Sequence, residues 1–451
     1  MTIYPMKKSH SARRDFKNFS VDFVISTAIG VFLTLGLIFA LAGCSPATPG
    51  VETLTPQPAP TPQPSPLPTI PTEEIPAGPI ILNLWIPPKF DPQGDSAAGQ
   101  LLADRLKEFT SRRSGVIIET RVKDVEGPGG IADTLRTANA AAPLALPDLV
   151  ALPYKTLQSA TADGLLHPFD GLTAVMDDPD WYEYARQFSH IQNSVFGIPF
   201  AGDALLMVYR PEIIESPPAN WTALAELAEP LAFAAASPEA LFALTLYRAS
   251  GGQITDADGR PTLELTPLSE VLTFFSQGSR SGYFPFSLTQ YETQDQLWSA
   301  YQEQQANMII TWAARYLQSP LEDSTLAGIP TTTSIPFTTG TGWAWALSSS
   351  DPQRQKLAAE LAEFLTTAQF LAEWDAAAGY LPPRPSALSS WENNPQRNLL
   401  IQVSQSAQLI PANEILSALS PALSSSTINV LKEQTDPATA AQSAVDMLLT
   451  P

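Results

Sequence analysis

The chain has 451 residues, 45 of them acidic and 25 basic, so its formal net charge at pH 7 is −20. This charge argues against nucleic acid and anionic membrane surfaces as partners, because both repel an acidic protein. The chain has a single cysteine. No disulfide within the chain can therefore hold the fold, and a large core must supply its stability.

Residues 1–43 have the layout of a secretory signal peptide. A basic head precedes an uncharged run over residues 23–42, which ends in Leu41-Ala42-Gly43-Cys44. This ending resembles the lipobox of bacterial lipoproteins, which implies that the Cys44 sulfur receives a diacylglyceryl group and that the peptide is cut before it. The alternative is an uncleaved transmembrane helix, because twenty apolar residues can span a bilayer. Both interpretations place the rest of the chain outside the cytoplasm.

A proline-rich linker follows over residues 44–78. Residues 45–77 contain eleven prolines among 33 residues and almost no large side chains. Such a segment cannot form a core, and we expect it to be disordered. Proline holds the chain near polyproline II at roughly 3.1 Å per residue, so the linker can hold a domain up to about 100 Å from its anchor.

The rest of the chain, about 370 residues, fits two lobes of typical size better than one core. Apolar strand-like runs alternate with helical periodicity, which is typical of an α/β fold with largely parallel sheets. From Gln369 onward the chain is predicted to be mostly helical. We predict strands at 80–86, 116–122, 149–152, 204–209, 231–236, 307–311 and 343–347, and helices at 130–141, 221–228, 238–250, 267–279 and 353–365.

Motifs of the common enzyme classes are missing from the sequence. The chain has three histidines, and neither a His-Glu-x-x-His zinc motif nor a Gly-x-Ser-x-Gly elbow occurs. The Gly-x-x-x-x-Gly-Lys phosphate loop and the Gly-x-Gly-x-x-Gly dinucleotide motif are missing as well. We therefore expect no enzyme activity, no cofactor and no metal. A pair of carboxylates for glycoside hydrolysis stays open, because any two acids can meet in a fold.

Several segments, taken in order, resemble the bacterial extracellular solute-binding proteins of ABC importers, in the carbohydrate-associated family 1 that includes maltose-binding protein. No single segment is specific, but their order and spacing together are. The segments that carry the resemblance are 147–152 (PDLVAL), 164–170 (GLLHPFD), 196–205 (FGIPFAGDAL), 217–224 (PPANWTAL), 342–347 (GWAWAL) and 379–384 (GYLPPR).

The resemblance implies a two-lobed periplasmic-binding-protein-like fold with a solute cleft between the lobes. The N-terminal lobe would comprise residues 79–203 and 340–388, and the C-terminal lobe residues 204–339 and 389–451. The lobes of such proteins close around the solute by a hinge. Glycines at two chain crossings are candidates for that hinge, although each can equally be an ordinary turn glycine: Gly202, Gly340 and Gly342.

The resemblance also implies candidate ligand contacts. Asp203 follows a crossing segment, where related proteins carry an acidic ligand contact, and its alternative role is a helix or turn cap. Trp312 stands where the family often has a stacking aromatic, and Tyr154 can equally belong to the core. The full set of candidate ligand-binding residues is Lys89, Phe90, Tyr154, Asp203, Trp312, Trp343 and Tyr380.

The implied function is a monomeric, lipid-anchored protein outside the cytoplasm that captures a small solute, expected to be a carbohydrate, and delivers it to the membrane subunits of an ABC importer. Two alternatives stay open. The first is a sensor or adhesion lipoprotein that kept the binding-protein fold. The second is a surface glycoside hydrolase. The sequence does not choose among solutes, because fold-level analogy does not identify cargo.

Overall fold

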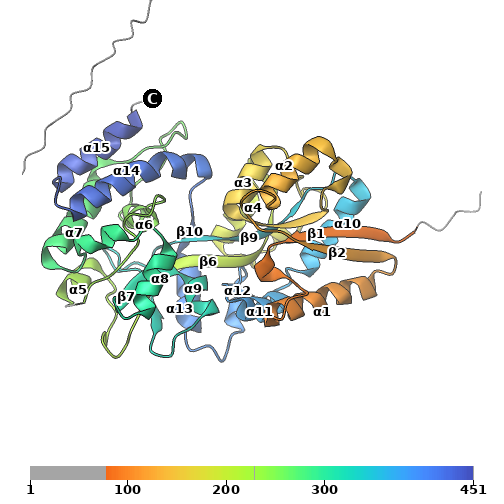
Figure 1. The fold of residues 1–451 in the computed structure, drawn as a ribbon, viewed down its shortest axis with the longest axis horizontal. Helices are drawn as coiled ribbons and strands as arrows, with labels where there is room; N and C mark the ends of the chain where they lie inside the picture. The colour runs from red at the N-terminus through yellow and green to blue at the C-terminus, as the bar shows by residue number, and fades with distance from the viewer. Residues whose placement is uncertain (1–77, 228, 450–451) are drawn as a thin grey trace, which may run out of the picture. The chain divides into compact units, whose positions relative to one another are not determined.

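The computed structural model describes residues 78–227 and 229–449 (Figure 1). The predictions for the signal peptide, Cys44 and most of the linker lie outside these residues. Within the described part of the chain, no helix is both long and apolar enough to cross a membrane.

An eight-stranded mixed sheet organises the described residues, with the path β2-β1-β3-β9-β6-β7 and with β10 and β8 paired to β9 and β6. β1 pairs in parallel with β2 and β3, and β9 pairs in parallel with β10, but the other pairs are antiparallel. The expectation of largely parallel sheets was therefore wrong. The strands of the eight-stranded sheet are β1 (Ile80–Ile86), β2 (Val116–Val122), β3 (Leu149–Pro153), β6 (Ile198–Tyr209), β7 (Met308–Trp312), β8 (Thr325–Ala327), β9 (Thr338–Leu347) and β10 (Ala407–Leu409). A separate two-stranded sheet is formed by β4 (His190–Ile191) and β5 (Ser194–Val195).

The cause of the mixed sheet is the pair of long strands β6 and β9, which run antiparallel to each other between two groups of elements (Figure 1). β6 pairs with β9 over its first part, up to Ala204 opposite Gly340. From Leu205 onward β6 pairs with β7 instead. On its return through the sheet, β9 pairs antiparallel with β3 and β6, which the alternation of strands and helices in the sequence does not reveal.

Helices surround the sheet, and the chain after residue 369 is mainly helical, as predicted. Their bounds are α1 (Ala97–Arg112), α2 (Ile131–Ala141), α3 (Tyr154–Ala162), α4 (Glu183–Ser189), α5 (Trp221–Glu226), α6 (Leu241–Ala249), α7 (Leu265–Ser281), α8 (Gln294–Gln302), α9 (Ala313–Gln318), α10 (Pro352–Phe364), α11 (Ala368–Ala378), α12 (Pro385–Ser389), α13 (Arg397–Ser406), α14 (Asn413–Leu431) and α15 (Pro437–Leu449). Short 3-10 turns are η1 (Pro88–Phe90), η2 (Pro143–Ala145), η3 (Val175–Asp177) and η4 (Phe286–Gln290).

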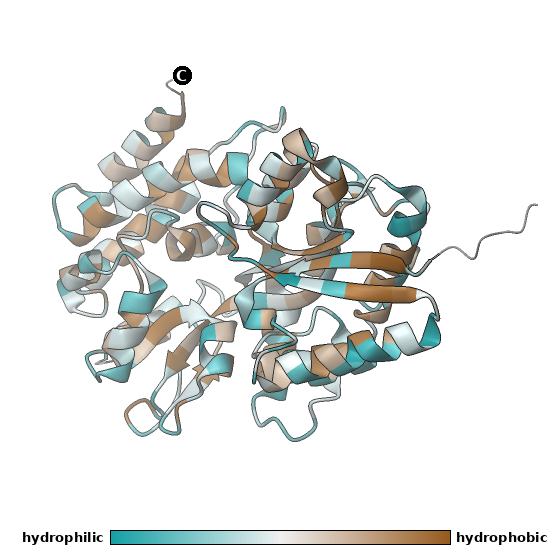
Figure 2. Cartoon of the chain, turned by 45° about the vertical axis from the view of Figure 1, so that its right-hand side comes forward, coloured by the Kyte–Doolittle hydropathy of each residue, from teal (hydrophilic) through white to brown (hydrophobic). Residues whose placement is uncertain are grey.

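The first βαβ unit shows why local sequence predicts these elements well. Ser96 caps α1 by accepting a hydrogen bond from the Gly99 amide at 3.0 Å. Leu102, Leu106 and Phe109 lie on one face of α1 and are buried, as their spacing predicts. In Figure 2 the strands beside α1 are largely brown, whereas α1 itself carries both teal and brown segments. Amphipathic spacing and a cap therefore fix this helix against the sheet.

The predicted strand at 231–236 is wrong. Ala232 forms one parallel bridge with Ile309 of β7, in which its amide donates to the Met308 carbonyl at 2.8 Å. The Ala236 amide donates to the Tyr291 carbonyl instead, so the segment leaves the sheet after a single bridge. This alanine-rich run is apolar because most of its residues are buried in the core. An apolar run alone, however, does not form the ladder of hydrogen bonds that defines a strand.

The three crossing glycines lie inside strands, and none has a positive φ. A Cβ added at Gly202 would meet the Tyr184 hydroxyl, and one added at Gly342 would meet the Ala201 carbonyl. At Gly340 the nearest atoms would be Ala407 Cβ at 3.1 Å and the Tyr184 ring at 3.3 Å. These glycines therefore allow close packing at the crossing, whereas their hinge role stays a prediction.

Candidate functional site

Four side chains singled out by the sequence meet beside the carboxyl end of β1. Lys89 and Phe90 lie in η1, directly after β1, whereas Trp343 lies in β9 and Tyr380 follows α11. The Lys89 Nζ atom donates a hydrogen bond to the Tyr380 hydroxyl at 2.6 Å and lies 3.9 Å from the centre of the Trp343 ring. The Phe90 and Trp343 rings pack edge to face, with 5.1 Å between their centres. We call these four side chains the Lys89 group.

The rings of the Lys89 group are buried, but its lysine is not. Phe90 is 1%, Tyr380 5% and Trp343 8% exposed, whereas Lys89 as a residue is exposed. The rings shield the ammonium from solvent, and this loss of hydration lowers the pKa of Lys89 to about 8, against the charge of Asp203, which raises it. The group thus presents apolar ring faces together with one strong donor.

The Asp203 carboxylate joins β6 to the first turn of α9. Its Oδ1 atom accepts hydrogen bonds from the amides of Ala204 at 2.9 Å and Ala314 at 3.0 Å. Burial raises the pKa of Asp203 to about 7, although these amides and the charge of Lys89 act in the opposite direction. Asp203 therefore caps α9 in the structure, and its role as a ligand contact stays a prediction.

We expect Asp203→Asn to flatten the pH dependence of stability between about pH 4 and pH 7. The folded protein keeps a proton on Asp203 in this window that the unfolded chain has released, so wild-type stability falls as pH rises. The amide oxygen of asparagine can accept the same two hydrogen bonds without the charge. Relative to pH 4, the variant should gain roughly 2 kcal/mol over wild type at pH 7, allowing for solvent screening. Urea unfolding at each pH measures this difference, and parallel curves for the two proteins would contradict it.

The two remaining candidate ligand-binding residues, Trp312 and Tyr154, lie outside the Lys89 group. Trp312 ends β7 opposite Leu205 and is half-buried, two residues before the Ala314 amide that binds Asp203. Tyr154 begins α3 and is 6% exposed, with its ring edge-on to Phe188 at 5.0 Å between centres. Tyr154 belongs to a hydrophobic cluster separate from the one that contains the Lys89 rings. The structure therefore brings Trp312 toward Asp203 but places Tyr154 in the core, and ligand contact by either stays a prediction.

A buried carboxyl group that the sequence did not single out lies in α11. Asp375 is fully buried, and neither of its oxygens has a hydrogen-bond partner among the described residues. Burial raises its pKa well above the usual value. An aspartate in an alanine-rich helix looks like a solvated surface residue, so the sequence carries no signal for this burial.

A cavity of about 740 Å³ lies between the end of α9 and the loop that follows α12. Trp391 stands in its wall, and the indole Nε1 donates to the Ala372 carbonyl at 2.8 Å, which fixes the ring. The sequence analysis missed Trp391, although the polar run after it, Glu392-Asn393-Asn394, was a usable signal. The wall consists of Tyr316, Leu317, Pro320, Leu321, Glu322, Ser324, Ala376, Gly379, Ser390, Trp391, Glu392, Asn393, Asn394, Pro395 and Gln396.

This cavity borders the Lys89 group through the end of α11. Gly379 lies in the cavity wall and directly precedes Tyr380. Its φ of 69° ends α11 in the left-handed conformation that glycine adopts without strain. The Gln318 side chain at the end of α9 hydrogen bonds the Tyr380 hydroxyl and also donates to the Ala378 carbonyl at 3.4 Å. The cavity wall and the Lys89 group therefore adjoin each other at Gly379 and Tyr380.

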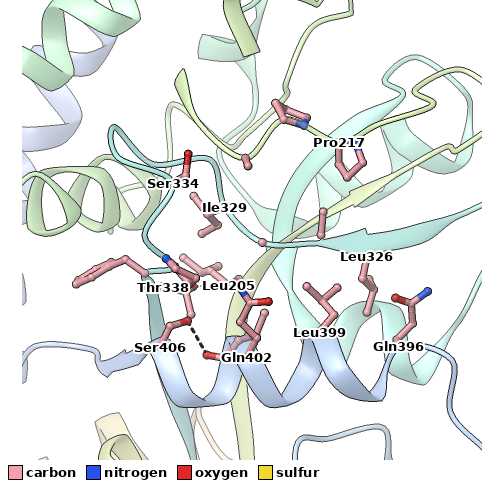
Figure 3. A pocket seen from close by; sticks show the side chains of 17 residues that line it. Leu205, Pro217, Leu326, Ile329, Ser334, Thr338, Gln396, Leu399, Gln402 and Ser406 are labelled. Atoms are coloured by element: carbon pink, nitrogen blue, oxygen red, sulfur yellow. Dashed lines mark hydrogen bonds between the residues drawn. The ribbon is translucent and has the colours of Figure 1, made fainter. Parts of the chain in front are cut away.

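A smaller cavity of about 290 Å³ lies on the other side of Gln396, which lines both cavities. Figure 3 shows Leu399 and Gln402 rising from α13 toward Leu326 and Ile329. Its walls are mainly aliphatic, so it offers few partners to a polar solute. The larger of these two cavities has more polar side chains in its wall, among them Glu322, Asn393 and Asn394.

Such a cavity, next to convergent rings and charges on a mixed α/β scaffold, defines a protein that binds small molecules. The chain belongs to the bacterial extracellular solute-binding protein family, whose model matches residues 104–398. This confirms the family resemblance and an extracytoplasmic location. The family is one of binding proteins rather than enzymes.

Several solved structures with the same fold are bacterial sugar-binding proteins. The cyclic α-maltosyl-1,6-maltose binding protein of Arthrobacter globiformis is 17% identical, with a TM-score of 0.68 over 82% of this chain and 98% of that chain. The maltose-binding protein MalE of Listeria monocytogenes, solved with maltose, is 16% identical, with a TM-score of 0.66 over 82% and 96%. A solute-binding protein of Thermotoga lettingae, solved with α-D-tagatose, is 17% identical, with a TM-score of 0.62 over 82% and 98%.

These neighbours confirm the predicted two-lobed binding-protein fold. Among curated proteins, none matches the chain in sequence.

Proposed function

We propose that this protein captures a carbohydrate in the larger cavity and the adjoining Lys89 group, and that it delivers the sugar to an ABC importer. The observation that carries the proposal is the composition of the cavity wall. Sugars require apolar ring faces for their C–H surfaces and polar groups for their hydroxyls. Trp391 and Tyr316 supply rings, and Asn393, Asn394 and Gln396 supply amides that both donate and accept.

The structural neighbours support a sugar as the solute. The Listeria and Thermotoga lettingae proteins were solved with maltose and α-D-tagatose, respectively. Those proteins share the fold but less than a fifth of their residues with this chain, so they favour the ligand class and not a particular sugar.

The proposed lobes divide at residues 203/204 and 339/340. In support of this division, β6 changes its partner from β9 to β7 between Ala204 and Leu205. Closure of the lobes around the sugar would be stabilised by the better fit of the solute to the closed state.

A thermal-shift screen of the protein against sugars, polyols, amino acids and small peptides tests the solute class. A sugar present at a hundred times its dissociation constant should add about 2.7 kcal/mol to the free energy of unfolding and raise the melting temperature by a measurable amount. Stabilisation by amino acids or peptides, with none by any sugar, would contradict the carbohydrate assignment and leave the fold untouched.

The same sugars distinguish delivery to an importer from the two alternatives, a hydrolase and a sensor. Glu322 and Glu392 both line the cavity, so a hydrolase would release reducing ends from an oligosaccharide, whereas a monomeric binding protein returns it unchanged. Loss of labelled-sugar uptake in cells that lack the protein supports delivery to an importer, and unchanged uptake supports a sensor. The proposed lipid anchor at Cys44 rests on the sequence, and the intact mass of the membrane-bound protein tests it.

A further inference from the structure

The Lys89 group is arranged as a binding site for an ammonium ion. Rings from three separate segments face one nitrogen: the Lys89 Nζ atom lies 3.9 Å from the centre of the Trp343 ring and 5.1 Å from the centres of both Phe90 and Tyr380. The Tyr380 hydroxyl accepts its hydrogen bond at 2.6 Å. Cations held over several aromatic faces in this way are attracted by the ring quadrupoles.

The Asp203 side chain, which is partly ionised at neutral pH, completes the arrangement. Asp203 lies close enough for its charge to act on Lys89, and Lys89 acts on Asp203 in return. The four contributing segments are η1, β6, β9 and the turn after α11, so the site depends on the tertiary fold and not on one loop. The buried rings have no other cation against them among the described contacts with Trp343 and Tyr380.

Lys89, whose ammonium fills this site in the structure, is the part of the Lys89 group that can move. Lys89 is an exposed residue in a three-residue turn, whereas the rings around its ammonium are buried. Holding the ammonium here costs it hydration, which is the reason for its lowered pKa. Release of Lys89 into water would restore that hydration and free the ring faces for a second cation.

The solute cavity is next to this position. Gly379 lies in the cavity wall immediately before Tyr380, and Gln318 connects α9 to the Tyr380 hydroxyl. A sugar ring in the cavity can therefore extend a substituent toward the Lys89 group. The net charge of −20 also favours the approach of a cationic solute.

We infer that Lys89 occupies the position of a ligand ammonium in the empty protein, and that the solute is an amino sugar whose amine displaces it. This inference rests on the proposed carbohydrate function. The exchange breaks no covalent bond: one ammonium leaves the rings and the Tyr380 hydroxyl, and another takes its place.

Calorimetric titration of the protein at neutral pH tests the inference with matched sugars. The probes are the 2-amino derivatives of glucose, galactose and mannose, their N-acetyl forms and the parent sugars, with choline as an ammonium ion that carries no sugar ring. At least one amino sugar should bind about tenfold or more tightly than its N-acetyl and parent forms. Lys89→Met, which removes the competing ammonium, should tighten that binding further.

Lys123→Met is the matched control, because the Lys123 ammonium also lies over a ring, Trp85 at 4.9 Å, outside the Lys89 group. It should leave the affinity unchanged. Equal binding of neutral and amino sugars overturns this inference and leaves the proposed function standing. Weaker binding by Lys89→Met also overturns it, because Lys89 then acts as a donor to the solute. Binding of choline alone, or of none of the probes, overturns this inference, whereas the proposed function is overturned only by the failure of every sugar in the thermal-shift screen.

Discussion

Gly202→Ala is expected to lower the free energy of unfolding by about 3 kcal/mol, because the added methyl group has no space. It would meet the Tyr184 hydroxyl and lie 2.9 Å from the Leu381 carbonyl oxygen. Gly202 and Leu381 also exchange two backbone hydrogen bonds, at 2.6 and 2.9 Å, so the backbone cannot move away without losing them. The steric clash lies at the crossing of β6 and β9, which positions Asp203 and Trp343.

The cause of this loss can be tested by removing the obstacle. The Tyr184 hydroxyl is buried and has no hydrogen-bond partner among the described residues, so Tyr184→Phe alone should change stability by less than about 1 kcal/mol. Combined with Gly202→Ala it should restore about half of the lost stability, because the Leu381 carbonyl stays close. Gly328→Ala is the control, since a Cβ there meets nothing within 4 Å.

Urea unfolding of the four variants and the wild type measures these differences. Strict additivity of Gly202→Ala and Tyr184→Phe would contradict the steric explanation. It would place the cost of Gly202→Ala in the backbone alone.

The fold could be predicted from the sequence where local physics decides it. β1 and β2 have the predicted bounds, because two apolar runs of strand length with a capped amphipathic helix between them leave little choice. The antiparallel course of β9 was missed because it depends on partners far apart in sequence, Leu149 with Leu347 and Gly202 with Gly342. The 231–236 error has the same origin, since its hydrogen bonds go to β7 and to the Tyr291 carbonyl.

The residues of the candidate site, too, were predicted in part and missed in part. Lys89, Phe90, Trp343 and Tyr380 were named separately through the family resemblance, and the structure brings them together. Trp391 was missed because the polar run that follows it was not used as a signal for a cavity wall, and Asp375 was missed because its helical surroundings suggest exposure. Burial of single polar groups depends on tertiary packing, which the pattern of one segment does not encode.

Trp391→Ala is expected to weaken sugar binding by about a hundredfold, equivalent to roughly 2.7 kcal/mol. The indole forms part of the cavity wall and is held in place by its hydrogen bond to the Ala372 carbonyl. Its loss removes an apolar face of the kind on which a sugar ring packs, together with the hydrogen bond to that carbonyl. Trp221→Ala is the matched control, because Trp221 stacks on Phe274 and does not line this cavity.

Isothermal titration calorimetry with the sugar that stabilises the protein most tests most directly whether this cavity is the sugar site. The proposed function predicts reversible binding of one sugar per chain by the wild type and by Trp221→Ala, with the binding weakened about a hundredfold in Trp391→Ala. Undiminished binding by Trp391→Ala, or no binding of any sugar by the wild type, would contradict it.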